Sequence, residues 1–268
     1  MTATSPGARA VTVSHDELEL LGHVLSIDEL PVVLAATPRF DSVSDREAAF
    51  ARAHASLAAR GLLPAGHPDP GVADLLAVLA RPTTELALRR YTGAGEASRM
   101  CAVRGDTGTS VAALRGPASY VLTELDAIDP VLVLDVLGHR APLDIGALRA
   151  PTEPLAAAMG DLTDPPAVAR RLSALGCARR DADRLAVAFA GCIGHAEIVA
   201  ITHEGGGRRR ITGPVTVFDT PAGRIVGTST VSVDGTAWTT LGPGGDARVR
   251  QAIRDLLPGS SEMVTELP

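Results

Sequence analysis

The sequence predicts an α+β fold: a central, mostly antiparallel sheet of about eight strands, flanked by helices and shared by two similar halves. A hairpin pattern occurs twice, at 85–116 and again, 112 residues further on, at 197–230. Each copy opens on a glutamate, alternates apolar with polar residues and reaches an Asp-Thr turn, at Asp106 or Asp219. Runs of helices precede runs of hairpins, an order that favours α+β over a parallel α/β fold. One continuous sheet is economical, because two four-stranded sheets would each leave edges to cover.

Length and composition indicate a globular chain with a large core. The chain has 268 residues, of which 46% are hydrophobic and 3% aromatic, so Leu, Val, Ala and Ile must build the core. We expect one domain spanning 1–268, with internal halves at about 10–138 and 150–257. The last ten residues, 259–268, are predicted to be a flexible tail.

The first half is predicted to begin with a short strand at 11–13 and a helix that starts in the capping box Ser14-x-x-Glu17. The segment PVVLA, 31–35, is typical of a buried strand or extended run. Later helices end at Gly61 and before Pro82, residues that stop or break helices. The expected helices span 45–60, 71–80 and 128–137, and four strands of an antiparallel meander lie between the last two, at 84–91, 98–104, 109–115 and 118–124.

A linker at 138–151, rich in Gly and Pro, leads to a second half with the same order. Its amphipathic helices have apolar residues spaced to share a face, such as Val168 with Leu172, and Leu185 with Phe189. Asp246 is expected to cap the final helix. The predicted helices span 152–159, 165–175, 181–193 and 246–257, and the four strands span 196–204, 212–219, 223–231 and 235–241.

Charge and cysteine usage exclude several classes of protein. Net charge is −6, every basic residue is arginine, and the only cluster, Arg208-Arg209-Arg210, is typical of a solvated turn, so we expect no nucleic-acid partner. No apolar run approaches the roughly 18 residues of a membrane span. The opening MTATSPGARAVTV has no hydrophobic signal region, and the three cysteines show no paired spacing. We therefore expect a cytoplasmic protein without membrane insertion. The absence of lysine and asparagine is typical of a GC-rich genome, such as an actinobacterial one.

The search for catalytic motifs finds one candidate pair of carboxylates. Asp106-Thr107-Gly108 matches the aspartic-protease triplet, and the repeat supplies Asp219-Thr220, although Pro221 replaces the glycine. That chemistry needs two carboxylates that share a proton. A hairpin turn explains the same residues equally well, because Asp accepts backbone hydrogen bonds and Gly adopts positive φ. An Asp106/Asp219 hydrolase stays as an alternative, while the leading hypothesis is a protein without enzymatic activity.

Other candidate site residues have ordinary structural explanations. His195 and His203 could share a strand face, but no third ligand with metal-like spacing accompanies them, so no metal or other cofactor is expected. Cys101 and Cys192 are interpreted as small buried side chains. Trp238 is interpreted as a core or sheet-face anchor. A small-ligand-binding module is a further alternative, although the sequence names no converging polar groups for a pocket.

Three stretches together resemble the EspG family of type VII (ESX) secretion-associated chaperones of actinobacteria. They are VTVSHDELELLGHVLSIDELPVVLA, then ARGLLPAG with VADLLAVLARPTTEL and RGDTGTSVAALRG, and GPVTVFDTPAGRIVGTSTVSVDGTAWTTLGPGGDARVRQAIRDLL. The pattern covers about 10–257, and the last run is the most specific. The resemblance implies a central antiparallel-rich sheet with helical bundles packed on it and two halves related by pseudo-twofold symmetry. It also implies a cytosolic chaperone that binds a PE–PPE-like heterodimer or a related helical substrate and shields an apolar tip before export.

The resemblance implies a contact region rather than individual contact residues. The region comprises the helical bundle at about 152–193 and the strands 196–204 and 212–219. Within it we select apolar candidates for the floor of a partner-binding surface, with membership of the ordinary core as the alternative for each. They are Leu172, Leu175, Leu185, Phe189, Ile198 and Val215. The client, the secretion system and the oligomeric state, monomer or homodimer, stay open.

Overall fold

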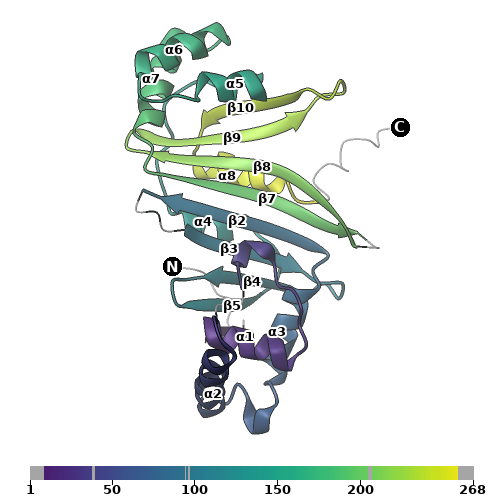
Figure 1. Cartoon of the computed structure of the whole chain (residues 1–268). Helices are drawn as coiled ribbons and strands as arrows, with labels where there is room; N and C mark the ends of the chain where they lie inside the picture. Colours follow the sequence, from purple (N-terminus) through teal and green to yellow (C-terminus); the bar gives the residue numbers. More distant parts are fainter. Residues whose placement is uncertain (1–8, 38–39, 94, 96, 205–206, 259–268) are drawn as a thin grey trace, which may run out of the picture. The chain divides into compact units, whose positions relative to one another are not determined.

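The computed structural model describes residues 9–37, 40–93, 95, 97–204 and 207–258; the predicted tail, 259–268, and parts of the turns at 93–97 and 205–210 lie outside the described residues. Ten strands form one antiparallel sheet in the order β1-β5-β4-β3-β2-β7-β8-β9-β10-β6 (Figure 1). The predicted fold class is confirmed. By contacts, the chain divides into two compact units. Unit 1 comprises Met1–Leu88, Ser98–Asp129 and Ile201–Arg210, and unit 2 comprises Arg89–Ala97, Pro130–Ala200 and Ile211–Pro268.

In unit 1, two α-helices and a 3₁₀ turn, α1, α3 and η1, pack against strands β4 and β5, and α2 packs against α1. The first part of the chain supplies β1 (Ala10–Ser14), α1 (His15–Val24), η1 (Val32–Leu34), α2 (Val43–Ala59), η2 (Pro64–Gly66), α3 (Pro70–Ala80), β2 (Thr84–Thr92), β3 (Ala97–Arg104), β4 (Ser110–Arg115) and β5 (Ser119–Leu125).

In unit 2, α5 contacts β10 and β6, while α8 contacts α4 and β9. Figure 1 shows α5, α6 and α7 in teal-green beside the yellow-green β9 and β10. The second part of the chain supplies α4 (Val131–Leu137), β6 (Leu148–Pro151), α5 (Thr152–Ala158), α6 (Pro165–Ala174), α7 (Arg179–Ala190), β7 (Gly194–Glu204), β8 (Arg208–Thr220), β9 (Gly223–Val231), β10 (Ala237–Pro243) and α8 (Asp246–Arg254).

The internal repeat includes an edge strand that the hairpin pattern alone does not reveal. In the first half β1 pairs antiparallel with β5, the last strand of its meander, with Val13 opposite Tyr120. In the second half β6 pairs with β10 in the same way, with Leu148 opposite Leu241. Strand β6 lies inside the segment predicted as a linker, 138–151. Each half is therefore a five-stranded motif whose first strand returns to close the meander, which gives ten strands instead of about eight.

Three local predictions need correction. PVVLA is not a strand: Val32–Leu34 form the 3₁₀ turn η1, because Pro31 begins it and Ala35 adopts a left-handed conformation at its end. Asp246 does not cap α8; Gly245 occupies that position, and Asp246 is bound instead by His139, 2.7 Å away. Helix α7 ends at Ala190, three residues before the predicted end, because Gly191 follows.

The capping box at the start of α1 is confirmed, and Arg60 links it to the edge strand β1. The Ser14 N–H donates to Oε2 of Glu17 at 2.7 Å, and the Glu17 N–H donates to Oγ of Ser14 at 3.1 Å. Arg60, at the end of α2, donates to the Glu17 carboxylate at 3.1 Å and to the backbone carbonyl of Thr12. One guanidinium thus joins α1, α2 and an edge strand whose backbone groups would otherwise be open to another chain.

Glu17 is expected to make this corner sensitive to acid. Burial alone would raise its pKa, but hydrogen bonds from Ser14, Ser56 and Arg60 outweigh burial, so the pKa lies below its ordinary 4.5. A carboxyl with a lowered folded-state pKa stabilises the fold above its unfolded pKa, and this contribution is lost as pH falls through the folded pKa.

We expect Glu17→Gln to lower the free energy of unfolding by about 1–2 kcal/mol at neutral pH, discounted because Arg60 is partly exposed. The deficit should be smaller at an acidic pH below the folded-state pKa of Glu17, because the wild-type carboxyl is protonated there. Urea titrations at both pH values measure it, with the exposed Glu47→Gln on α2 as the matched control. A deficit of the same size at both pH values would contradict the role given to ionised Glu17.

A second buried carboxyl, that of Glu85 on β2, has a pKa shifted in the opposite direction. It is 3% exposed, and its Oε2 lies 3.5 Å from Nε2 of His203 on β7. Burial raises the pKa of Glu85 to about 7, although the positive charge of Arg209 acts against this rise. Burial and Arg209 both lower the pKa of His203. Near neutrality, the protonation of Glu85 therefore contributes to the stability of unit 1.

The substitution Glu85→Gln should remove one source of alkaline destabilisation. The folded pKa is raised above its ordinary 4.5, so the contribution of Glu85 is full below 4.5 and is lost as pH rises through about 7. Above about pH 8 the variant should exceed wild type in unfolding free energy by about 2–3 kcal/mol, and below about pH 4 the two should agree. Denaturant unfolding at the two pH values tests this, and parallel pH profiles for the two proteins would refute it.

Candidate partner-binding surface

The helical bundle of unit 2 is defined by clear local signals. Helix α6 begins where Asp164 accepts a hydrogen bond from the Ala167 N–H at 3.1 Å, with proline at the first two helical positions. The helix ends before Gly176, because the φ of +90° at this glycine lies outside the helical range. Helix α7 follows and is strongly amphipathic, with Leu185 and Phe189 buried on one side. The two helices form a hairpin that presents one apolar face to the sheet.

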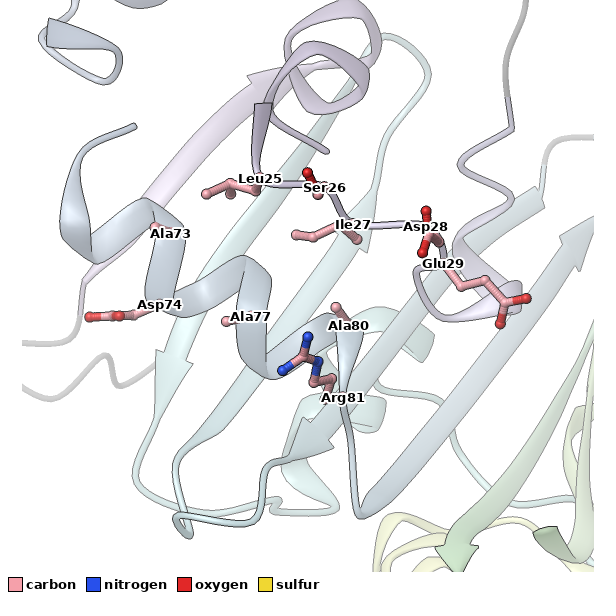
Figure 2. Close-up of a pocket in the computed structure, with 10 residues that line it drawn as sticks. All are labelled: Leu25, Ser26, Ile27, Asp28, Glu29, Ala73, Asp74, Ala77, Ala80 and Arg81. Carbon is pink, nitrogen blue, oxygen red and sulfur yellow. The ribbon is translucent and has the colours of Figure 1, made fainter. Parts of the chain in front are cut away.

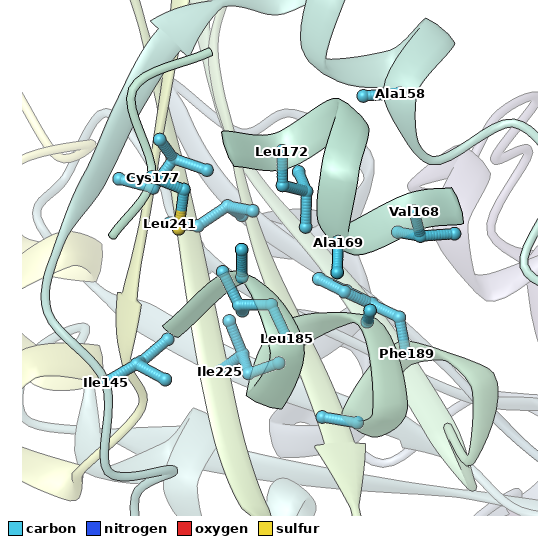
Figure 3. Close-up of a cluster of buried hydrophobic side chains, with 14 of the residues drawn as sticks. Ile145, Ala158, Val168, Ala169, Leu172, Cys177, Leu185, Phe189, Ile225 and Leu241 are labelled. Atoms are coloured by element: carbon cyan, nitrogen blue, oxygen red, sulfur yellow. The ribbon is translucent and has the colours of Figure 1, made fainter. Parts of the chain in front are cut away.

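That face joins α5, β6, β9 and β10 in one buried cluster (Figure 3). Leu172 and Leu185 are fully buried in it, and Ile225 and Leu241 supply the sheet side. Phe189 meets Phe218 edge-to-face, with ring centroids 5.1 Å apart and an interplanar angle of 79°. Burying side chains of this size stabilises a fold by about 1.5–3 kcal/mol each, so the cluster fixes the bundle on the sheet.

The six predicted contact residues are divided between this cluster and the neighbouring strands. Leu172, Leu185 and Phe189 belong to the cluster, and the partly buried Leu175 packs against it. Ile198 and Val215 are buried on β7 and β8. Val215 and Phe218 are three positions apart on β8, an odd number, so their side chains lie on opposite faces of the sheet. Five of the six are therefore buried, three of them in the cluster, and Leu175 is the one with partial exposure. Their role in contacting a partner stays a prediction.

Two apolar side chains of the same region face solvent. Val187 on α7 is 64% exposed, and Ile193, just after the helix, is 42% exposed. Neither is among the six predicted residues, because those were chosen from the buried apolar stripes of the helices and strands. The sequence did hold one signal of an exposed apolar side chain: Val187 is apolar but lies outside the buried stripe of α7.

The two carboxylates of the hydrolase alternative have unlike environments. Asp106 is exposed in the turn between β3 and β4 of unit 1. Asp219, in unit 2, is 4% exposed and receives two hydrogen bonds from the fully buried Arg224, at 2.7 and 3.2 Å. Two further arginines, Arg90 and Arg140, lie 3.5 and 3.6 Å from its oxygens. The partners of Asp219 are thus three guanidinium groups, whereas the hydrolase would need a second carboxyl beside it to share a proton.

The remaining candidate residues have packing roles. His195 stacks on Tyr91 with centroids 4.9 Å apart, and Arg149 lies over the half-buried Trp238 ring at 4.9 Å. Cys101 is buried as predicted, whereas Cys192 is exposed, because α7 ends before it. Within the described part of the chain, no group of three His, Cys, Asp or Glu side chains could hold a metal ion, and no helix is long and apolar enough to cross a membrane.

A groove of about 430 Å³ in unit 1 bears on the small-ligand alternative. It lies between α3 and the segment after α1, and small alanine side chains, among them Ala77, line it (Figure 2). The carboxylates of Asp74 and Glu29 point away from each other, towards opposite ends of the view. A specific small-molecule site needs polar groups that converge on the ligand, so this groove gives that alternative no support.

Comparison with known proteins defines the family. The family model described as EspG family matches residues 14–255. This chain belongs to the EspG family. An ESX-3 secretion-associated protein EspG3 of Mycolicibacterium smegmatis is 31% identical over 264 residues, covering 95% of this chain and 89% of that protein. The EspG3 of Mycobacterium tuberculosis is 28% identical over 266 residues, covering 92% and 90%.

One solved structure has a fold similar to that of this chain. It is that of the Mycobacterium tuberculosis type VII secretion system chaperone EspG5 in complex with a PE25–PPE41 dimer. The TM-score is 0.77 at 17% identity, covering 94% of this chain and 98% of that one. At this identity the match concerns the fold, and it agrees with the sheet and helices described above. The family resemblance stated from the sequence is therefore confirmed.

The repeated Asp-Thr turns offer a matched test of structural importance. Asp219→Ala should leave Arg224 buried without its counter-charge and lower the free energy of unfolding by about 3–5 kcal/mol. Asp106→Ala, in the exposed turn of this EspG-family chain, should change it by less than about 0.5 kcal/mol. Urea unfolding of the two variants against wild type measures both values. Equal effects would contradict the environments described for these carboxylates.

Proposed function

We propose that this EspG-family protein is a chaperone of type VII secretion that binds a PE–PPE-like heterodimer or a related helical substrate. It would shield an apolar tip of the client and keep the client soluble for export. The observation that carries the proposal is membership of the family across residues 14–255, together with a fold shared with a chaperone solved on its PE25–PPE41 client. No catalytic step is part of this function. The halves would act together as one domain, in the cytoplasm, where a chaperone meets its client before export.

Two exposed apolar residues near the end of α7 support a location for the contact. A partner that buries apolar surface needs side chains accessible before binding, and Val187 and Ile193 meet this condition near the end of α7. The buried residues Leu172, Leu185 and Phe189 would hold α6 and α7 rigid beneath that surface. A rigid surface binds more tightly, because little conformational entropy is lost on association. The partly buried Leu175 would extend the contact region along the hairpin.

The proposal predicts a stable complex between this protein and a PE–PPE-like pair encoded in the same genome. The two client chains would be co-expressed with the chaperone and purified by size exclusion, with affinity measured by calorimetry. A complex with one chaperone per heterodimer, burying about 800 Å² on each partner, would be of ordinary size. Failure of every PE–PPE-like pair of the genome to form a complex would refute the proposed function.

The location is tested by a charged substitution on α7. Val187→Arg should weaken client binding at least about tenfold, because burying an unpaired charge in an apolar interface is costly. The matched control is Val43→Arg, a valine on α2 of unit 1 that is 74% exposed and outside the proposed surface. Both positions are exposed, so both variants should keep the wild-type unfolding midpoint. Binding unchanged by Val187→Arg, or weakened equally by Val43→Arg, would rule out this location.

A further inference from the structure

The arginines around Asp219 carry more positive charge than the carboxylates bound to them can balance. Arg224 and Asp219 form one neutral pair, both buried. Arg90 and Arg140 add two positive charges beside the same carboxylate. Among the described residues, no second carboxylate makes an ion pair with any of the three arginines. Asp246, which His139 contacts at 2.7 Å, makes no ion pair with these three arginines.

The hydrogen-bond donors of the cluster are also in excess. Arg224 uses its Nε on Asp219 and its Nη2 on both Asp219 and the carbonyl of Leu137, but its Nη1 is buried without a partner. Buried polar atoms that lack a partner are rare in native proteins. Arg90 and Arg140 contact the carboxylate at 3.5 and 3.6 Å, longer than a strong charged hydrogen bond. The acceptor that this donor set needs is not supplied by Asp219.

Two of the arginines are both accessible and held in place. The side chain of Arg90 is 24% exposed and that of Arg140 is 35% exposed, so each reaches solvent at the rim of the buried pair. Arg90 donates to the carbonyl of Val136 at 3.0 Å, and Arg140 donates to the carbonyl of Thr220 at 3.1 Å. These backbone contacts hold both guanidinium groups beside Asp219, where they would otherwise separate by mutual repulsion.

We propose that Arg90 and Arg140 form the rim of a binding site for a small oxyanion of the phosphate or carboxylate class. A guanidinium presents several N–H donors in one plane, a geometry that matches the oxygens of these anions. The bound anion supplies the missing negative charge, and the buried Nη1 of Arg224 makes the field at the rim more positive. This inference does not rest on the proposed chaperone function.

The test titrates inorganic phosphate and, separately, acetate into the purified full chain by calorimetry at constant ionic strength. Wild type should bind one equivalent of at least one anion saturably. Arg90→Gln and Arg140→Gln should each weaken that binding at least about tenfold, because each removes a guanidinium from the rim. Arg248→Gln, which neutralises an exposed arginine of the same unit on α8, should bind as wild type does. Circular dichroism and urea midpoints verify that each variant is folded.

The two titrations distinguish the source of the anion. Tighter binding of phosphate assigns the site to a dissolved phosphate or phosphate ester, and tighter binding of acetate assigns it to a carboxylate. The proposal is overturned if neither anion binds wild type saturably. It is also overturned if binding survives both rim substitutions, or if Arg248→Gln weakens it equally, since the effect would then be one of overall charge.

Discussion

The architecture of unit 2 depends on the Asp219–Arg224 ion pair, which joins segments distant in sequence at one buried point. Arg224 contacts the carbonyl of Leu137 at the end of α4 through its side chain. Its backbone carbonyl accepts hydrogen bonds from the N–H groups of Leu143 and Gly244, both near 2.9 Å. Since a buried charge is tolerated only when it is paired, the pair requires these segments to be assembled together.

The bundle on the other face of unit 2 divides its apolar residues into two groups. One group forms the interior with the sheet, and the other remains at the surface at Val187 and Ile193. The proposed function needs both groups, because exposed apolar side chains stay accessible to a client only when a rigid interior holds them in place. The largest apolar residues of α6 and α7 are buried, and Val187 and Ile193 are the residues that the proposed function would place against a client.

Sequence reasoning succeeded where a local signal determines the structure. Ser14 and Glu17 marked the start of α1, and the alternation of apolar residues located the strands of both meanders. It failed where tertiary contacts decide. Strand β6 has four residues, and only its pairing with β10 defines it as a strand. Asp246 contacts His139 and does not cap α8. For the candidate surface, periodicity identified the bundle but selected the face turned to the core, because burial and partner contact both favour apolar residues.

Closing each meander with its own first strand has a consequence for how the chain assembles. Val13 can pair with Tyr120, and Leu148 with Leu241, only after the whole intervening segment has been synthesised. Each half therefore contains contacts of high sequence separation, which slow folding because a long loop must close before the contact stabilises it. On the ribosome, the first half can complete its sheet while the second is still being translated. The repeat thus allows a long sheet to form in two successive steps, each with its own closing strand.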